Sequence, residues 1–492
     1  MSVNKRSFFY FLPGLQDILF ISIFLAVMLL GPIMLNMDGD LPRHLLTGKV
    51  ILETKSVPRT EPFAYPYYEK PFVSHAQDWL SDSLFYLVYK FAGLAGLVIL
   101  SAVILAATFS ILYAYTSKQT NLRLFSLFLV LWGAAATSLN WVTRPFLFSM
   151  LFLAIWLACL DKLSRNEKIR LWYFPVLIMI WSNMHGEFIA GFLALLAYAG
   201  GWLWDYVFDR NLAKPEVGKN LLLVAGISFL ASLINPAGLG PWKTVLGFVN
   251  NSYIMSRMYE ARQPDFSRPE FMVLLGLLSF SIFLLAIKKQ KISTAQAILL
   301  AGFSGMSLIA GRNIHLYGIV APFVLARAFS SDNIAGIMSR LENTLENMEQ
   351  KIKGGVWPLL ITLAVGVMVL STQSFQSIYR FSPAMFPIQA TNWLQENPQK
   401  GNMYNDINWG GYLAMHLWPG QSVFADSMAD TTGEMTYEYE SVLTLSPQWK
   451  GILSKYQVQW AVIQTSSDLA LMLETESWEV IYIDQTATIL RK

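Results

Sequence analysis

Long apolar segments, each of about 20 residues, constrain the fold of this chain more than any other feature. About eleven of them could cross a lipid bilayer as helices. They lie near residues 17–35, 94–115, 122–139, 145–160, 171–184, 187–207, 219–235, 271–287, 294–311, 313–330 and 356–372. Hydrophobic residues make up 54% of the chain and charged residues only 14%, whereas soluble proteins carry about a quarter charged residues. The composition therefore argues against a soluble enzyme and predicts a membrane protein.

The lysines and arginines of the short loops predict the orientation, because such residues concentrate in cytoplasmic loops. With a cytoplasmic N-terminus, every second short loop carries them and the opposite short loops carry almost none. They are Lys5, Arg6, Lys118, Arg123, Lys162, Arg165, Lys168, Arg170, Arg210, Lys214, Lys219, Lys288, Lys289, Lys291, Lys351 and Lys353. An odd number of spans then places the C-terminal segment outside. No small-residue cleavage site follows the first apolar segment, so we expect it to stay as an anchor.

Three segments are predicted to be extracytoplasmic: a loop over 36–92, a second loop near 236–269, and a tail over 381–492. We therefore divide the chain into a membrane domain over 1–380 and a soluble domain over 381–492. Helix-sized and strand-sized apolar runs alternate in the tail, which predicts a small α/β domain. Its expected helices are Pro387–Asn397, Trp409–Leu417, Pro447–Lys455 and Ser467–Thr475, and its expected strands are Ser422–Ala425, Trp460–Gln464, Val480–Asp484 and Thr486–Leu490.

The fold class is thus an α-helical polytopic membrane protein with about eleven transmembrane helices and a small C-terminal extracytoplasmic α/β domain. An amphipathic stretch over 337–352 is expected to lie along the inner membrane surface.

Several kinds of chemistry find no support in the sequence. Cys159 is the only cysteine, which excludes an intrachain disulfide and cysteine-based zinc or iron–sulfur sites. The net charge of +3 is too small to suggest binding of nucleic acid. The chain has no Walker loop, dinucleotide fingerprint, nucleophile elbow or HExxH motif, so cytosolic nucleotide chemistry is not indicated.

Polar residues gather at one level of the predicted topology, the outer ends of the spans. Ionisable groups at a membrane are costly and ask for an explanation. The candidates at the span ends and in the second outer loop are Asp38, Asp40, Arg144, His185, Glu187, Glu260, Arg312 and His315, and the first outer loop adds His44, His75 and Asp78. This convergence is the main functional signal in the chain.

Each candidate also has a purely structural interpretation. Asp38 and Asp40 could cap the helix that follows them, because acids favour helix N-termini. Arg144 could be an interfacial anchor whose side chain reaches toward water. His185 and Glu187 flank a glycine that by itself accounts for a tight turn. His44 and His75 could be surface groups.

An acid and several cations at one membrane face suit group transfer from a lipid phosphate. A carboxylate can act as general base toward an acceptor hydroxyl or amine. Arginines and histidines can hold a departing phosphate or diphosphate. Asp38, Asp40 and Glu187 could also share a divalent cation such as Mg or Mn through their oxygens, and a metal-free base is equally allowed.

The sequence also resembles a known group, the GT-C integral-membrane glycosyltransferases, and in particular uncharacterised bacterial members. The resemblance lies in the overall architecture and in these segments: Asp38-Gly39-Asp40, His44–Leu52, Val57–Tyr65, His75–Leu80, Arg144-Pro145-Phe146, Asn183–Gly186, Asn235–Gly238 and Trp409–Tyr412. It implies a polyprenyl-phosphate-linked sugar as donor and a glycan, lipid or protein as acceptor. It also implies a bacterial inner membrane as the location.

By this resemblance the catalytic or metal-binding acid is Asp38 or Asp40, and Arg144 and Arg312 contact the carrier phosphate. The chain lacks the WWD-type motif of oligosaccharyltransferases and the paired acids of protein O-mannosyltransferases, which argues against both branches. Two other functions stay open at this point. One is a transporter or flippase of lipid-linked sugars, and the other is a non-catalytic envelope assembly scaffold.

Overall fold

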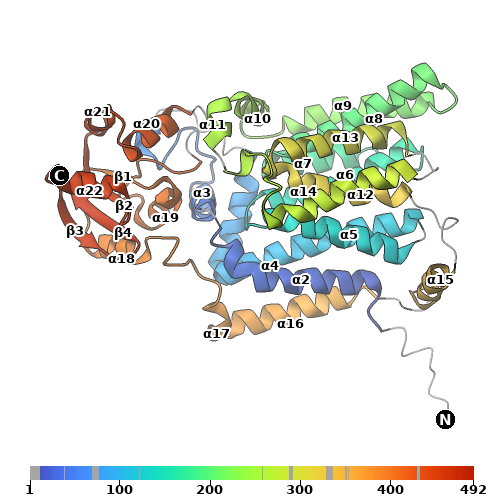
Figure 1. The fold of residues 1–492 in the computed structure, drawn as a ribbon, viewed down its shortest axis with the longest axis horizontal. Coiled ribbons are helices and arrows are strands. Elements are labelled where there is room, and N and C mark those ends of the chain that lie inside the picture. Colours follow the sequence, from blue (N-terminus) through green and yellow to red (C-terminus); the bar gives the residue numbers. More distant parts are fainter. Residues whose placement is uncertain are drawn as a thin grey trace, which may run out of the picture.

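The computed structural model describes residues 11–37, 39–68, 77–120, 122–257, 259–287, 292–328, 336–349, 352, 354–428 and 433–492. A bundle of long helices forms most of the molecule, and a smaller mixed domain built by the C-terminal part of the chain packs at one end (Figure 1). We call this end of the bundle the domain end. Asp38 and His75 lie outside the described residues.

Every predicted apolar segment contains a helix. These helices are α2 (Leu15–Met34), α4 (Trp79–Thr120), α5 (Arg123–Thr137), α6 (Phe146–Ser164), α7 (Tyr173–Met184), α8 (Phe188–Phe208), α9 (Pro215–Ser232), α12 (Met272–Ile287), α13 (Thr294–Ile309), α14 (Ile314–Leu325) and α16 (Trp357–Ser371). Within the described ranges, six helical segments are long and apolar enough to cross a membrane, and three apolar helices are shorter. The polytopic helical architecture is confirmed, and the count of about eleven spans stays a prediction.

The bundle has an apolar outside as well as an apolar core. Leu29, Leu222 and Ile282 are 82%, 72% and 71% exposed, on α2, α9 and α12 respectively. In contrast, Trp156 and Trp181 are fully buried between helices. Water would penalise such exposed surface, whereas lipid tails accept it at no cost. The helix surfaces therefore match a bilayer.

Helix α4 is longer than one span and bends at Gly93, whose φ of +61° lies in the left-handed region that favours glycine. Its first part falls inside the segment predicted as an outer loop over 36–92. That segment also contains α3 (Asp40–Thr54). The predicted loop is thus largely helical, with the short η1 (Tyr65–Tyr67) beyond α3.

Helix α15 (Ile337–Glu349) lies at the end of the bundle opposite to the domain end (Figure 1). The Glu342 carboxylate accepts hydrogen bonds from the backbone N–H groups of Arg123 and Leu124 at 2.8 and 2.9 Å. An acid at a helix N-terminus satisfies donors that have no partner within the helix. Helix α15 thereby caps α5.

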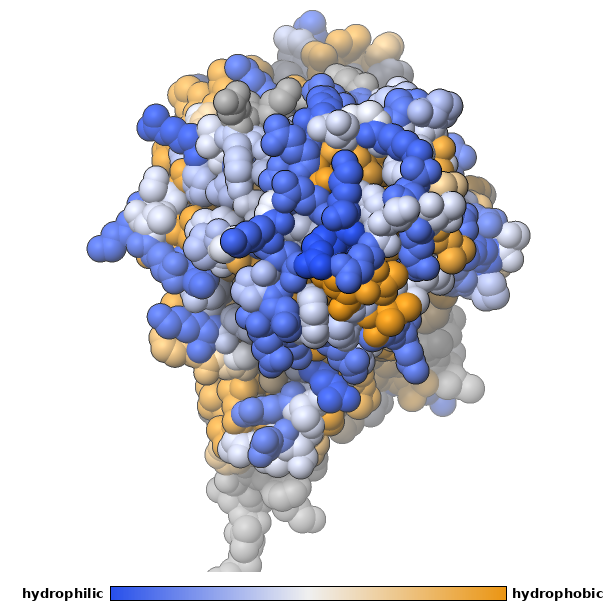
Figure 2. Space-filling model, turned by 90° about the vertical axis from the view of Figure 1, so that its left-hand side faces the viewer, coloured by the Kyte–Doolittle hydropathy of each residue, from blue (hydrophilic) through white to orange (hydrophobic). Residues whose placement is uncertain are grey.

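The C-terminal domain is a four-stranded sheet with helices around it. The strands are β1 (Asn402–Asn405), β2 (Val458–Gln464), β3 (Glu479–Ile483) and β4 (Ala487–Arg491), in the order β1-β2-β4-β3, and the helices are α18 (Ile388–Glu396), α19 (Ile407–Leu417), α20 (Glu434–Leu443), α21 (Trp449–Lys455) and α22 (Asp468–Thr475). Strands β1 and β2 are parallel and the other pairs are antiparallel. Its outward surface is largely hydrophilic (Figure 2).

One predicted strand is wrong. Residues 422–425 do not join the ladder of the sheet: their backbone forms a single bridge, between Val423 and Ala64 of the predicted first outer loop, and they meet β1 only through the Asn405 side chain and packing. The first strand of the sheet is instead β1, which lies before α19. The sequence did not predict β1, because it has none of the β-branched residues that are typical of strands.

The remaining short elements connect the helices. They are η3 (Ser138–Asn140), α10 (Gly240–Asn250), α11 (Ser252–Arg257), η4 (Tyr259–Ala261), η5 (Pro269–Phe271), η6 (Gly311–Asn313), η7 (Ala326–Ala328) and α17 (Gln373–Gln376).

Candidate functional site

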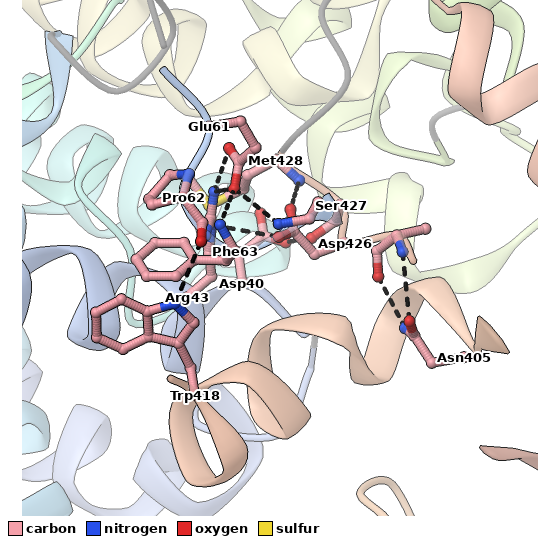
Figure 3. Close-up of polar contacts among 12 residues, drawn as sticks. Asp40, Arg43, Glu61, Pro62, Phe63, Asn405, Trp418, Asp426, Ser427 and Met428 are labelled. Atoms are coloured by element: carbon pink, nitrogen blue, oxygen red, sulfur yellow. Dashed lines mark hydrogen bonds and ion pairs between the residues drawn. The ribbon is translucent and has the colours of Figure 1, made fainter. Parts of the chain in front are cut away.

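Asp40 is the first residue of α3 and stands where three parts of the chain meet. Its Oδ2 is paired with the guanidinium of Arg144, which lies just before α6. Its Oδ1 accepts a hydrogen bond from the hydroxyl of Ser427, in the C-terminal domain. The carboxylate is therefore held by Arg144 from the bundle and by Ser427 from the domain. Figure 3 shows Asp40 beside Ser427.

The charge state of Asp40 follows from these partners. Burial alone raises the pKa of this carboxyl group, but Arg144, Ser427 and His44 together outweigh it and hold the pKa below its usual value. Asp40 is thus ionised at neutral pH. Such a carboxylate is a weak base that orients a hydroxyl well and takes its proton as the bond to the hydroxyl oxygen forms.

Arg144 lies between two carboxylates. Its Nη1 is 3.3 Å from Oε2 of Glu260 in η4, in addition to its contact with Asp40. The Arg144 side chain is 18% exposed. An arginine that is held by acids and still reachable from outside can exchange one of them for a phosphate oxygen.

A second cluster is centred on Glu187, directly before α8. His315 Nε2, at the start of α14, lies 3.0 Å from Glu187 Oε2, and His185 Nδ1 lies 3.6 Å from the same oxygen. His185 Nδ1 is also 3.0 Å from the hydroxyl of Ser149 on α6. Burial raises the pKa of Glu187, but the two histidines outweigh burial and hold the pKa well below its usual range.

A third group of polar residues lies between α3 and the start of α4. His44 Nδ1 is 2.7 Å from Oδ1 of Asp82. Burial lowers the pKa of His44, but the adjacent Asp82 carboxylate outweighs burial and raises it overall. Asp78 is buried, and its Oδ1 has no hydrogen-bond partner among the described residues. Burial, aided by repulsion from Asp82, raises the pKa of Asp78 to about 7.

Comparison with known proteins identifies the fold. No family model matches the chain, and no curated protein matches it in sequence. Its structure resembles that of the archaeal oligosaccharyltransferase AglB from Archaeoglobus fulgidus, with a TM-score of 0.57 and 12% identity over 90% of this chain and 69% of that one. The chain has a GT-C fold.

A second solved structure, ArnT from Cupriavidus metallidurans, matches with a TM-score of 0.44 and 12% identity, over 96% of this chain and 97% of that one. The first likeness, together with the apolar helices, establishes a GT-C membrane protein with a small C-terminal mixed domain.

Within this GT-C fold, most predicted site residues come together. Asp40, Arg144 and Glu260 form one cluster, and His185, Glu187 and His315 form another. His44 is near the first cluster and Asp78 near the second, since the charge of His44 lowers the pKa of Asp40 and the charge of His185 lowers that of Asp78. Arg312 is in η6, whose Gly311 N–H donates to Arg262 O at 2.8 Å beside Glu260. The positions of Asp38 and His75 stay predictions.

The described acids do not fit a divalent-cation site. No group of three or more histidines, cysteines, aspartates or glutamates within the described ranges has the geometry to hold a metal ion. Asp40 and Glu187 each have a cationic or histidine partner of their own. The metal set of Asp38, Asp40 and Glu187 therefore stays a prediction that depends on Asp38.

Sequence reasoning missed several residues of this region. Ser427 contacts Asp40, and Asp82 holds His44. Asp82 had a usable signal, since it is an acid in an otherwise apolar stretch that the prediction assigned to a loop. Ser427 had none, because nothing in its surroundings in the sequence indicates that the tail folds back onto α3.

Proposed function

We propose that this protein is a membrane glycosyltransferase that moves a sugar from a polyprenyl-phosphate carrier to an acceptor on the extracytoplasmic face of a bacterial inner membrane. The observation that carries the proposal is the Asp40–Arg144–Glu260 cluster at the domain end of the bundle. It joins an ionised acid to an accessible arginine where the helices end. The archaeal protein that shares the fold was solved with a dolichol-phosphate, which supports a carrier of the same kind.

The proposed step is a single displacement at the anomeric carbon of the sugar. Asp40 orients an acceptor hydroxyl and takes its proton as the new bond from oxygen to carbon forms. The bond from that carbon to the carrier phosphate breaks, and Arg144 neutralises the phosphate that leaves. Glu260 keeps Arg144 in place while its contact with Asp40 gives way to the phosphate. Arg312 would support the same phosphate.

The second cluster would bind the substrate. Glu187, His185 and His315 offer a carboxylate and imidazole nitrogens at the starts of α8 and α14. Sugar hydroxyl groups form hydrogen bonds with such groups. His44 and Asp78, from the predicted first outer loop, would add further hydrogen-bonding groups to this binding site.

The placement of these groups does not favour the transporter alternative. A transport path requires polar groups near the middle of the bilayer. Here Asp40, Arg144, Glu187 and His315 all lie at helix ends and are joined by contacts at the domain end.

Transfer from a panel of polyprenyl-phosphate sugars would test the proposal. We expect Asp40→Asn and Arg144→Ala to abolish or strongly reduce transfer while the folded protein is still obtained. Asp209→Asn and Arg210→Ala are matched controls, because both residues are exposed and lie beyond α8, away from the domain end. If the wild type transfers sugar and Asp40→Asn does so at the same rate, Asp40 is not the base. Absence of transfer from every donor would favour the scaffold.

A further inference from the structure

The C-terminal domain touches α3 through glycines. A Cβ on Gly39 would clash with the carbonyl oxygen of Asn408, and a Cβ on Gly410 would clash with that of Ala425. A Cβ on Gly411 would stand 2.9 Å from Gly39 O and about as close to Arg43. The Trp409-Gly410-Gly411-Tyr412 motif therefore has a physical role. Gly411 lets α19 approach α3 more closely than any larger residue would allow, and Gly410 lets α19 approach Ala425 and Asp426 of its own domain.

A buried ion cluster sits at this contact. Arg43 is fully buried, and its Nη2 lies 2.8 and 2.7 Å from the two carboxylate oxygens of Glu61. Its Nε lies 3.3 Å from Oδ2 of Asp426, which is also fully buried. The guanidinium stacks over the Phe63 ring at 4.0 Å (Figure 3). One buried arginine thus holds an acid from the first outer loop and an acid from the C-terminal domain.

The same cluster holds Ser427, the residue after Asp426, in position. The Asp426 Oδ1 accepts the backbone N–H of Met428 at 2.9 Å, which closes a tight turn around Ser427. The Ser427 hydroxyl projects from that turn and donates to Oδ1 of Asp40. Asp40 and Arg43 are three residues apart on α3 and so share one face of the helix. The C-terminal domain contacts this face at both positions, through Ser427 at Asp40 and through Asp426 at Arg43.

We propose that the C-terminal domain forms part of the active site, with Ser427 as the positioning residue for Asp40 and the Arg43–Glu61–Asp426 cluster as the anchor of Ser427. This inference rests on the proposed role of Asp40. In the ground state Arg144 and Ser427 each hold one carboxylate oxygen of Asp40. When a carrier phosphate draws Arg144 away, the bond from Ser427 still keeps the carboxylate turned toward the acceptor.

A double-mutant cycle read by thermal unfolding tests the contact without any assay of activity. Ser427→Ala and Asp40→Ala should lower the melting temperature by less in combination than the sum of their separate effects, because both remove the same hydrogen bond. Ser446→Ala is the matched control. Its hydroxyl donates within the same domain, to Ser441 O at 2.8 Å, so its effect should add to that of Asp40→Ala. Additivity of Ser427→Ala with Asp40→Ala would overturn the proposal.

Kinetics test the positioning role. Ser427→Ala should lower kcat about 10-fold or more with little change in KM for the donor, because a misoriented group slows chemistry more than it weakens binding. Ser427→Thr, which restores a hydroxyl, should recover most of kcat, and Ser446→Ala should behave as wild type. Full kcat in Ser427→Ala, or equal losses in the alanine and threonine variants, would overturn the proposal. A wild type without transfer activity would refute the proposed function instead, and the thermal cycle alone would then decide whether the contact exists.

Discussion

Two clusters at opposite ends of the bundle each pair an aspartate with arginine and a hydroxyl group, and they differ in how far the aspartate is buried. At the far end, the buried Asp161 carboxylate is held by Arg327 at 2.5 Å, by Arg165 at 3.2 Å and by the Tyr115 hydroxyl. At the domain end, Asp40 is held by Arg144 and Ser427, and its side chain is 14% exposed. The Asp161 carboxylate is closed to solvent, whereas the Asp40 carboxylate is not.

This difference in burial suggests a structural role for the Asp161 cluster and a functional role for the Asp40 cluster. Asp161 is 1% exposed, and its contacts come from four helical elements, α4, α6, α13 and η7. A saturated cluster of this kind ties helices together. At the domain end the acids are the accessible groups, since the Asp40 side chain is 14% exposed and the Glu260 side chain is 36% exposed. A charged cluster that is open to solvent can exchange a protein partner for a ligand. Composition alone does not distinguish the two clusters.

The largest expected effect is on catalysis at the domain end. Asp40→Asn keeps the shape of the side chain and removes its charge. We expect transfer to fall about 10³-fold, since a positioned base contributes roughly 10²–10⁴-fold. The melting temperature should change little in comparison. Initial rates of sugar transfer, with circular dichroism to confirm folding, provide the measurement.

The opposite result is expected at the far end. Asp161→Ala leaves Arg327 and Arg165 without their buried carboxylate, and breaking a buried pair in this way costs about 3–5 kcal/mol. We expect a large fall in melting temperature in detergent and normal transfer per folded molecule. Intact stability with lost transfer would contradict the division between the two clusters.

Replacing the arginine should give a moderate effect. Arg144→Lys keeps the charge but loses the fork that can bind Asp40 or a phosphate through two nitrogens. We expect KM for the donor to rise about 10-fold, with a smaller fall in kcat. Steady-state kinetics would show it. Arg327→Lys is the matched variant at the far end, and its KM should equal that of the wild type.

The smallest expected effect is a shift in pH dependence. Because the pKa of Asp40 is lowered, the wild type should stay active as the pH falls through the ordinary carboxyl range. Arg144→Ala removes the strongest favourable partner, while burial of Asp40 still raises its pKa. The acidic limb of residual activity should therefore move to higher pH. A limb that stays in place would show that Arg144 does not set the charge state of Asp40.

The sequence predicted the helices well and the site in part. The apolar segments were found because length and hydropathy decide where a chain can cross a bilayer. The helix ends then predicted the level at which Asp40, Arg144, Glu187 and His315 lie. Their pairing could not be predicted, because Asp40 and Arg144 are 104 positions apart and come together only because α3 and α6 both pack against α4.

The contribution of the tail was beyond prediction for a related reason. Ser427 follows a segment that was expected to be a strand of the sheet, whereas the backbone of residues 422–425 forms its one bridge with the predicted first outer loop. Gly410 and Gly411 were noted as part of a familiar motif. Their role emerges only when α19 is seen against α3, which Gly411 meets, and against Ala425 and Asp426, which Gly410 meets, since a close approach is a property of two surfaces.

The most direct measurement is an electron cryo-microscopy map of the full chain in lipid with undecaprenyl phosphate added. Our account predicts phosphate density within hydrogen-bonding distance of the Arg144 guanidinium, beside Asp40 and the C-terminal domain. Phosphate density at Arg165 and Arg327 at the far end, with none near Arg144, would contradict it.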